Sequence, residues 1–145
     1  FGIVRDAGWV DLPLLLNSFN SHLQSKGRFF ANDWSFNTQT NDTFNRIIDC
    51  RGVGASSDLA SVGIKVQADH GEVLTLRSRL DTKGMCINRV KWLLPRGDSV
   101  FKLGATYKWN IEQSAPTDEG RTELLSSIRP IISPEVFDEF EVLNH

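Results

Sequence analysis

The sequence predicts an α+β fold in which a mainly antiparallel sheet of about six strands is flanked by helices. Residues 12–26 have apolar positions at helical spacing. Residues 28–112 read as strands that follow one another through short turns with no helix between, which favours antiparallel pairing. Residues 117–141 return to helical signals. We expect a curved sheet, half-barrel or barrel, with helices over one face or an open end.

Length and composition predict a single soluble domain over residues 1–145. A chain of 145 residues buries about 70% of its unfolded surface. Its 40% hydrophobic and 23% charged residues are ordinary for a globular protein. No apolar run approaches the roughly 20 residues that a membrane span needs. The chain begins at Phe1 without an initiator Met or a signal-peptide pattern, as expected of a processed product or a fragment, and an intracellular location is favoured.

The first element is an amphipathic helix. Asp11 is a good N-cap, Pro13 is tolerated in a first turn, and Gly27 suits the left-handed residue after a helix. Its apolar residues recur at i, i+3, i+4, i+7 and i+11, which predicts a single apolar face. These residues are Leu12, Leu15, Leu16, Phe19 and Leu23.

Several short segments in the middle of the chain read as strands. Arg28–Phe36 is rich in aromatic residues, and Phe44–Arg51 is also strand-like. Ser61–Ala68 and Glu72–Leu80 resemble the two arms of a hairpin. Met85–Leu94 is a further strand with apolar residues on both faces.

Ser99–Glu112 is the longest alternating stretch. A period of two over this length predicts one strand with a buried face and a solvated face. Lys102 and Lys108 lie on the solvated face. The predicted buried face consists of Phe101, Leu103, Ala105, Tyr107, Trp109 and Ile111.

The C-terminal segment predicts one or two helices. Thr122–Arg129 forms a short helical pattern that Pro130 stops. Ser133, Pro134 and Glu135 then supply an N-cap, a first-position proline and an acidic first turn for another helix.

The charge distribution is uneven along the chain, although the formal net charge is only −2. Between residues 77 and 108 there are eight basic and two acidic residues, whereas residues 110–145 contain eight acidic and two basic residues. If the strand faces coincide, a basic patch forms on the sheet. The predicted anion-binding residues are Arg77, Arg79, Arg89, Lys91, Lys102 and Lys108.

Three hypotheses of function follow. The first is a non-enzymatic binding or assembly domain whose basic face binds an anionic partner, namely RNA, single-stranded DNA or an acidic protein surface. Within it, the acidic C-terminal segment docks on the basic face in cis or on a neighbouring copy, giving a homo-oligomer. The second is a structural or adhesion module that binds protein through its loops and helical ends. The third is a small hydrolase-like enzyme with a pocket lined by His70 or a cysteine.

A tetrapeptide at a predicted hairpin tip adds to the second hypothesis. Arg96, Gly97, Asp98 and Ser99 follow Pro95. The sequence RGDS resembles the integrin-recognition motif of cell-adhesion proteins, which implies an exposed interaction loop at Arg96, Gly97 and Asp98. Gly-Asp is equally what a tight hairpin turn requires.

No pattern for a metal, a cofactor or a catalytic residue stands out. The two cysteines, Cys50 and Cys86, fall in predicted strands, and both a disulfide and two reduced thiols are compatible with their positions. There is no CxxC motif or Cys/His cluster, so we expect no zinc site. No Gly-x-Ser-x-Gly elbow is present either.

Overall fold

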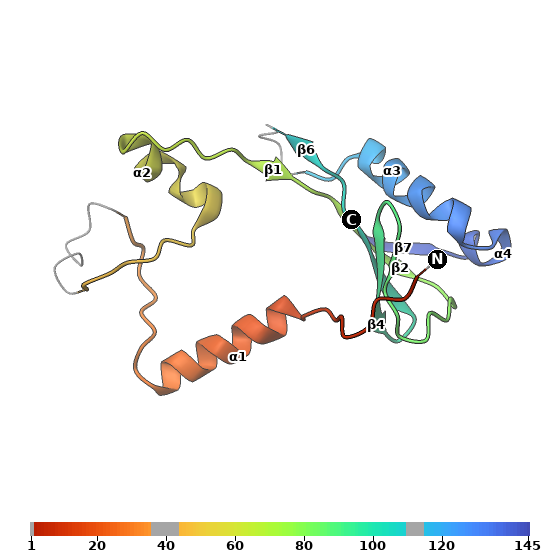
Figure 1. Ribbon diagram of the computed structural model, residues 1–145, viewed down its shortest axis with the longest axis horizontal. Coiled ribbons are helices and arrows are strands. Elements are labelled where there is room, and N and C mark those ends of the chain that lie inside the picture. The colour runs from red at the N-terminus through yellow and green to blue at the C-terminus, as the bar shows by residue number, and fades with distance from the viewer. Residues whose placement is uncertain (1, 36–43, 110–114) are drawn as a thin grey trace. The chain divides into compact units, whose positions relative to one another are not determined.

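The computed structural model describes residues 2–35, 44–109 and 115–145 (Figure 1). These residues form four α-helices and two antiparallel sheets, so the predicted α+β class is confirmed. The larger sheet is open rather than closed into a barrel. The chain divides into two units, Phe1–Ile47 and Ile48–His145, which are described separately below.

The first unit contains the predicted amphipathic helix. Helix α1 spans Leu12–Ser25, and Asp11 caps it by accepting a hydrogen bond from the backbone N–H of Leu14 at 3.2 Å. Gly27 follows with a φ of 61°, in the left-handed region that lacks a steric penalty only for glycine. Among the described residues 28–35 no strand forms, so the strand predicted for Arg28–Phe36 is wrong there. Aromatic composition alone does not supply the hydrogen-bonding neighbour that a strand requires.

The strands predicted for Phe44–Arg51 and Ser61–Ala68 are both wrong, and a short helical segment lies between them. Residues 44–51 contain no strand, the 3₁₀-helix η2 covers Gly52–Ala55, and α2 covers Ser56–Ser61. The Arg51 guanidinium pairs with Asp49 at 2.8 Å and with Asp58 at 2.7 Å, so it fastens the start of this segment to α2. Residues 62–68 form no strand, and the predicted hairpin with Glu72–Leu80 is therefore wrong.

The larger sheet has the strand order β3-β4-β5-β2-β7 and is antiparallel throughout. Its central strands are β5 and β2, and the short strands β3 and β7 form its edges. The strands are β2 (Val73–Arg77), β3 (Ile87–Asn88), β4 (Trp92–Gly97), β5 (Val100–Gly104) and β7 (Glu141–Asn144).

The long strand predicted for Ser99–Glu112 is divided in two. Strand β5 ends at Gly104, and β6 (Lys108–Trp109) pairs instead with β1 (Asp69–His70) in a separate two-stranded sheet. Tyr107 and Trp109, which alternation placed in the core, are 72% and 63% exposed, whereas Phe101 and Leu103 are buried. Ile111 lies outside the described residues.

The division coincides with a pair of hydrogen bonds at Thr106. Its backbone N–H donates to the carbonyl oxygen of Glu72 at 3.2 Å, and its side-chain Oγ1 accepts from the N–H of Glu72 at 2.9 Å. Thr106 is fully buried. The chain therefore leaves the larger sheet at Thr106, where the side-chain Oγ1 accepts the Glu72 N–H in place of a backbone carbonyl oxygen.

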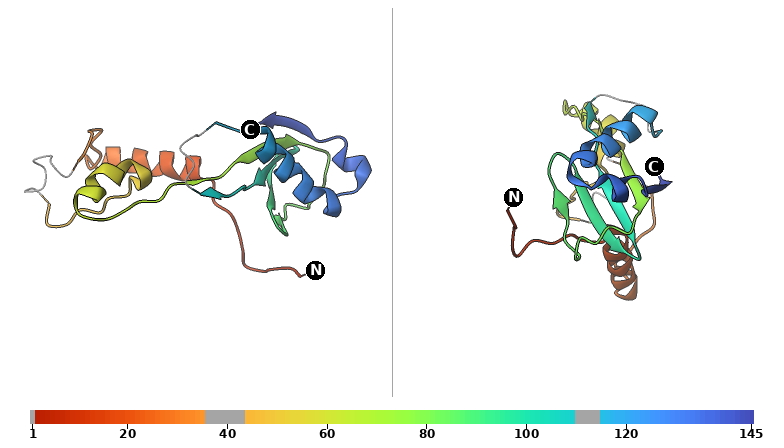
Figure 2. Two further views of the ribbon diagram at one scale, coloured as in Figure 1. Left: turned by 90° about the horizontal axis from the view of Figure 1, so that it is seen from above. Right: turned by 90° about the vertical axis from the view of Figure 1, so that its right-hand side faces the viewer.

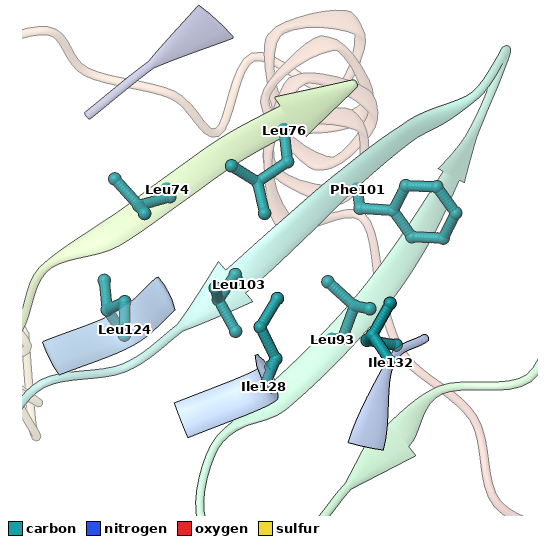
Figure 3. Close-up of a cluster of buried hydrophobic side chains, with 8 residues drawn as sticks. All are labelled: Leu74, Leu76, Leu93, Phe101, Leu103, Leu124, Ile128 and Ile132. Atoms are coloured by element: carbon teal, nitrogen blue, oxygen red, sulfur yellow. The ribbon is translucent and has the colours of Figure 1, made fainter. Parts of the chain in front are cut away.

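One face of the larger sheet packs against the C-terminal helices. Helix α3 spans Asp118–Ile128, and its apolar side contributes Leu124 and Ile128 to the core. Figure 2 shows α3 along this side of the sheet. The 3₁₀-helix η3 (Arg129–Ile131) follows. The core cluster, drawn in Figure 3, consists of Leu74, Leu76, Leu93, Phe101, Leu103, Leu124, Ile128 and Ile132.

The C-terminal helices are confirmed, but the last strand was not predicted. Helix α4 spans Pro134–Phe137 after Ser133, and β7 then pairs antiparallel with β2. The pairing of Arg77 with Glu141 and of Leu76 with Val142 places β7 beside a central strand. Four residues carry too little periodicity to reveal such a strand, because its stability comes from the neighbouring strand.

Three further observations complete the fold. Neither Cys50 nor Cys86 is in a disulfide, and both are exposed.

The indole of Trp92 lies over Gly104, where an added Cβ would come within 2.6 Å of the ring. None of the helices in the part of the chain that the structure describes is long and apolar enough to cross a membrane.

The core packing predicts the effect of a cavity. Leu124→Ala removes a fully buried side chain between α3 and the sheet. We expect it to lower the free energy of unfolding by about 2–5 kcal/mol in urea titrations followed by circular dichroism. Leu143→Ala makes the same change on β7, where the side chain is 37% exposed, and should cost much less. Equal losses at both positions would contradict this core assignment.

Candidate functional site

The six basic residues predicted to form one patch lie in several parts of the second unit. Lys102 on β5 pairs in register with Thr75, and Arg77 on β2 pairs with Val100. Because paired residues of an antiparallel sheet project to the same side, Arg77 and Lys102 share the sheet face opposite the core. Lys102 Nζ donates to Thr75 Oγ1 at 2.7 Å. This face therefore combines two of the predicted cations.

Three of the other cations contact the rest of the unit, and Arg89 is exposed in the turn between β3 and β4. Lys91 Nζ donates to the carbonyl oxygen of Ala105 at 2.6 Å and pairs with Glu123 of α3 at 2.7 Å. Lys108 lies on β6, in the smaller sheet. Arg79 follows β2 and pairs with Glu139.

Acidic residues of the C-terminal segment supply partners for three of these cations. Glu141 pairs with Arg77, Glu139 with Arg79, and Glu123 with Lys91, each at 2.7 Å. Arg77 and Glu141 are both more than half exposed, so that pair contributes little stability. The pairs nevertheless place carboxylates beside half of the predicted cations.

The RGDS tetrapeptide occupies the tip of the β4–β5 hairpin, as expected. Gly97, Asp98 and Ser99 are exposed, and Arg96 is half-buried. Asp98 and Ser99 have φ values of 51° and 60°. Two successive positive φ values are those of a type I′ turn, the turn that matches the twist of a two-residue hairpin. The tetrapeptide is thus accounted for as a turn, and its use as an interaction loop stays a prediction.

A buried carboxylate that the sequence did not single out connects several elements of the second unit. The side chain of Glu72 is 2% exposed. Its oxygens accept hydrogen bonds from the backbone N–H of Thr117 at 2.9 Å and from Thr117 Oγ1 at 2.8 Å. Thr117 is itself the N-cap of α3, accepting from the N–H of Gly120 at 3.0 Å. Glu72 therefore ties β2 to the beginning of α3.

Three basic side chains from other elements face the same carboxylate. His145 Nε2 lies 2.8 Å from Glu72 Oε2, and His70 Nε2 and Lys108 Nζ lie 3.8 Å and 3.9 Å from Oε1. Both histidine Nε2 atoms are buried without a hydrogen-bond partner, so the two histidine distances describe close approaches rather than well-aligned hydrogen bonds. We call Glu72, His70, His145, Lys108 and Thr117 the Glu72 cluster.

Burial and polar contacts act on the pKa of Glu72 in opposite directions. Burial raises the pKa because it disfavours the charged form. The two hydrogen bonds from Thr117 and the charges of His145 and Lys108 outweigh burial, and the pKa lies below its ordinary value of 4.5. Glu72 is therefore an anion at neutral pH, and its stabilising contacts are those of a carboxylate.

The arrangement indicates a structural role for the cluster. Both carboxylate oxygens are engaged by Thr117, which leaves Glu72 poorly placed to accept a substrate proton. Among the described residues, no group of three or more His, Cys, Asp and Glu side chains could hold a metal ion. The sequence signal for this cluster was faint, because Glu72, Lys108 and His145 are far apart in the chain.

A row of exposed apolar side chains lies along one side of α1. Leu12, Leu15, Leu16 and Phe19 are between 51% and 57% exposed, and Leu23 is half-buried. We call these five residues the apolar stripe of α1. None of the residues of α1 is buried. A stripe of this size on a monomer is typical of an interaction surface.

No protein-family model matches this chain, and no solved structure matches it.

The lowered pKa of Glu72 predicts a pH dependence of stability. A group whose pKa is lower in the folded state stabilises the fold above its unfolded pKa, and this contribution is lost as pH falls through the folded pKa. We expect the unfolding free energy to decrease as the pH is lowered below about 4.5. Glu72→Gln should destabilise the protein at neutral pH by about 1–3 kcal/mol and should reduce this loss of stability at acid pH.

Glu119→Gln is the control for that measurement, since Glu119 is an exposed carboxylate in the first turn of α3. The Glu119→Gln variant should lose stability at acid pH as the wild type does, when the unfolding free energy is measured in urea. An equal loss of stability at acid pH in the wild type and in Glu72→Gln would show that other carboxylates cause it.

Close packing at Gly120 predicts that alanine there destabilises the protein, the opposite of its usual effect in a helix. Alanine in place of glycine normally stabilises a helix by about 1 kcal/mol. At Gly120 the added Cβ would overlap the Glu72 carboxylate, so we expect Gly120→Ala to destabilise the protein in thermal unfolding. In a Glu72→Ala background the same substitution should become neutral or stabilising. Gly54→Ala, whose Cβ would have nothing nearer than 3.7 Å, is the control.

Proposed function

We propose that this chain is a non-enzymatic assembly module that binds protein through the apolar stripe of α1. The observation that carries the proposal is the absence of a core from the first unit. Among its described residues none is buried, and only Asp11, Leu23, Trp34 and Ser35 are half-buried. A segment that buries so little apolar surface does not offset the conformational entropy lost on folding.

The length of α1 supports the same conclusion. A helix of 14 residues is only marginally stable in water when nothing packs against it, because nucleation is costly. Its good N-cap at Asp11 and the left-handed Gly27 define where the helix begins and ends but contribute only modestly to stability. Covering the apolar stripe supplies the missing stabilisation, since burying a Leu or Phe side chain contributes about 1.5–3 kcal/mol.

The nature of the stripe favours a protein partner. A partner that buries Leu and Phe side chains must itself present an apolar surface. Further apolar residues near α1 are also exposed, including Val10 at 55% and Phe30 at 72%. Apolar contacts at the centre of an interface are typical of protein–protein association.

The hypothesis of an anionic partner remains a prediction, with less support from the geometry. Arg77, Arg79 and Lys91 have carboxylate partners within the chain. A polyanion would have to displace these carboxylates before it could gain the full benefit of counterion release. Of the other three predicted cations, Lys108 faces Glu72, so the remaining basis for this hypothesis is Lys102 on the sheet face and the exposed Arg89.

Site-specific photo-crosslinking tests the proposed function. Phe19 is replaced by the photoreactive residue p-benzoylphenylalanine in the full chain, and the illuminated protein is analysed by denaturing electrophoresis and mass spectrometry. We expect a defined covalent adduct with a protein, whether another copy or a different chain. The adduct should persist at high salt, because apolar contact is not screened.

The same photoreactive residue at Ser21 is the matched control. Ser21 lies on the opposite side of α1 from the stripe, since successive residues are about 100° apart around a helix. No adduct is expected there. Equal labelling from Phe19 and Ser21 would contradict the proposal, as would the absence of any Phe19 adduct both in the pure chain and in a lysate of its source cells.

A further inference from the structure

We infer that the partner of the apolar stripe is the α1 helix of further copies of this chain, and that these helices pack together as a bundle of three or more. The inference rests on the proposed function, because it names the occupant of the same surface. Three features of α1 carry it: the spacing of the stripe, the absence of charged residues, and the width of the apolar face.

The spacing is that of helices that pack along their length. Leu12, Leu16, Phe19 and Leu23 are separated by four, three and four residues. A 4-3-4 spacing keeps one seam of a helix facing a neighbouring helix, because it matches the heptad repeat of bundles and coiled coils. The same four residues also fit a surface helix on a globular core, so spacing alone does not select the occupant.

The absence of charged residues on α1 indicates which kind of helix packs against the apolar stripe. Its 14 residues, LPLLLNSFNSHLQS, include no Asp, Glu, Lys or Arg. Identical helices that pack side by side bring identical flanking residues together, and like charges there would repel. Interfaces between different helices commonly use opposite charges beside the seam to choose the partner. An uncharged helix suits association with its own copies and lacks this means of selecting another chain.

The same observation argues against a lipid surface as the occupant. Helices that lie in the plane of a membrane carry Lys and Arg on the polar face, where they meet anionic head groups. The polar face of α1 instead contains Asn17, Ser18, Ser21 and Gln24. Ser21 and Ser25 side chains donate to the carbonyl oxygens of Asn17 and His22, so part of this face is engaged within the helix.

The width of the apolar face indicates how many copies associate. Leu15 lies beside the seam and widens the face to about three residues in every seven. A two-residue seam suits a pair of helices, whereas a wider face is buried fully only when each helix has two neighbours. Leu15 is 51% exposed and would be covered in a bundle.

Sedimentation velocity of the full chain over a concentration series tests the inference. We expect a trimer or larger species whose association is unaffected by salt. Leu16→Ala/Phe19→Ala should weaken association roughly thirtyfold or more, since central apolar anchors dominate such interfaces. Alanine retains helix propensity, so this variant changes the surface without introducing a helix breaker.

Leu14→Ala is the matched control, because Leu14 is on α1 but on the side opposite the stripe and is 66% exposed. It should associate like the wild type. A monomer or a dimer at all concentrations would overturn the inference, as would equal weakening by the stripe variant and by Leu14→Ala.

Hydrogen exchange of the α1 amides separates failure of the inference from failure of the proposed function. A monomer whose α1 amides exchange rapidly has an uncovered stripe, so the partner is a different protein and only the inference falls. A monomer whose α1 amides are protected has the stripe covered within its own chain, which contradicts both the inference and the proposed function. Oligomers with protected α1 amides support both, provided that Leu16→Ala/Phe19→Ala loses the oligomers and the protection.

Discussion

The Glu72 carboxylate is the contact on which the second unit depends. It reaches from the start of β2 to the N-cap of α3, and it faces side chains from β1, β6 and the end of the chain. A buried carboxylate is costly unless hydrogen bonds and opposite charges compensate for lost solvation. Thr117 supplies the hydrogen bonds, and His145 and Lys108 supply the charge. Gly120 completes the arrangement by leaving room for the carboxylate. These five segments are thereby held at one point.

The uneven charge distribution has a structural explanation within the chain. Acidic residues after position 120 meet basic residues of the sheet region, as in the pairs of Glu141 with Arg77 and of Glu139 with Arg79. Exposed pairs of this kind add little stability. Their effect is on pairing preference, because opposite charges beside each other on β2 and β7 favour the observed register. The acidic C-terminal segment therefore forms ion pairs with basic residues of the same chain, and only the pair with Arg77 involves the sheet face.

The two units differ in what stabilises them. The second has a closed cluster of apolar side chains between α3 and the sheet. The first has a well-capped helix whose apolar stripe is exposed. The apolar core face of the sheet is covered by α3, whereas the apolar stripe of α1 is exposed. Because α1 contains no charged residue, its exposed surface offers only apolar and uncharged polar contacts.

By itself, the sequence determined the features that depend on near neighbours. The span and caps of α1, the hairpin turn at Asp98 and Ser99, and the helices after Pro116 follow from periodicity and from residues that favour particular backbone angles. The buried positions of Phe101 and Leu103 followed from alternation. Only the tertiary structure decided that the chain leaves the sheet after Gly104, that β7 joins β2, and that Glu72 meets Thr117 and His145. The physical reason is that these features consist of contacts between residues far apart in the chain, and a strand or a buried charge is stable only where its partners are present.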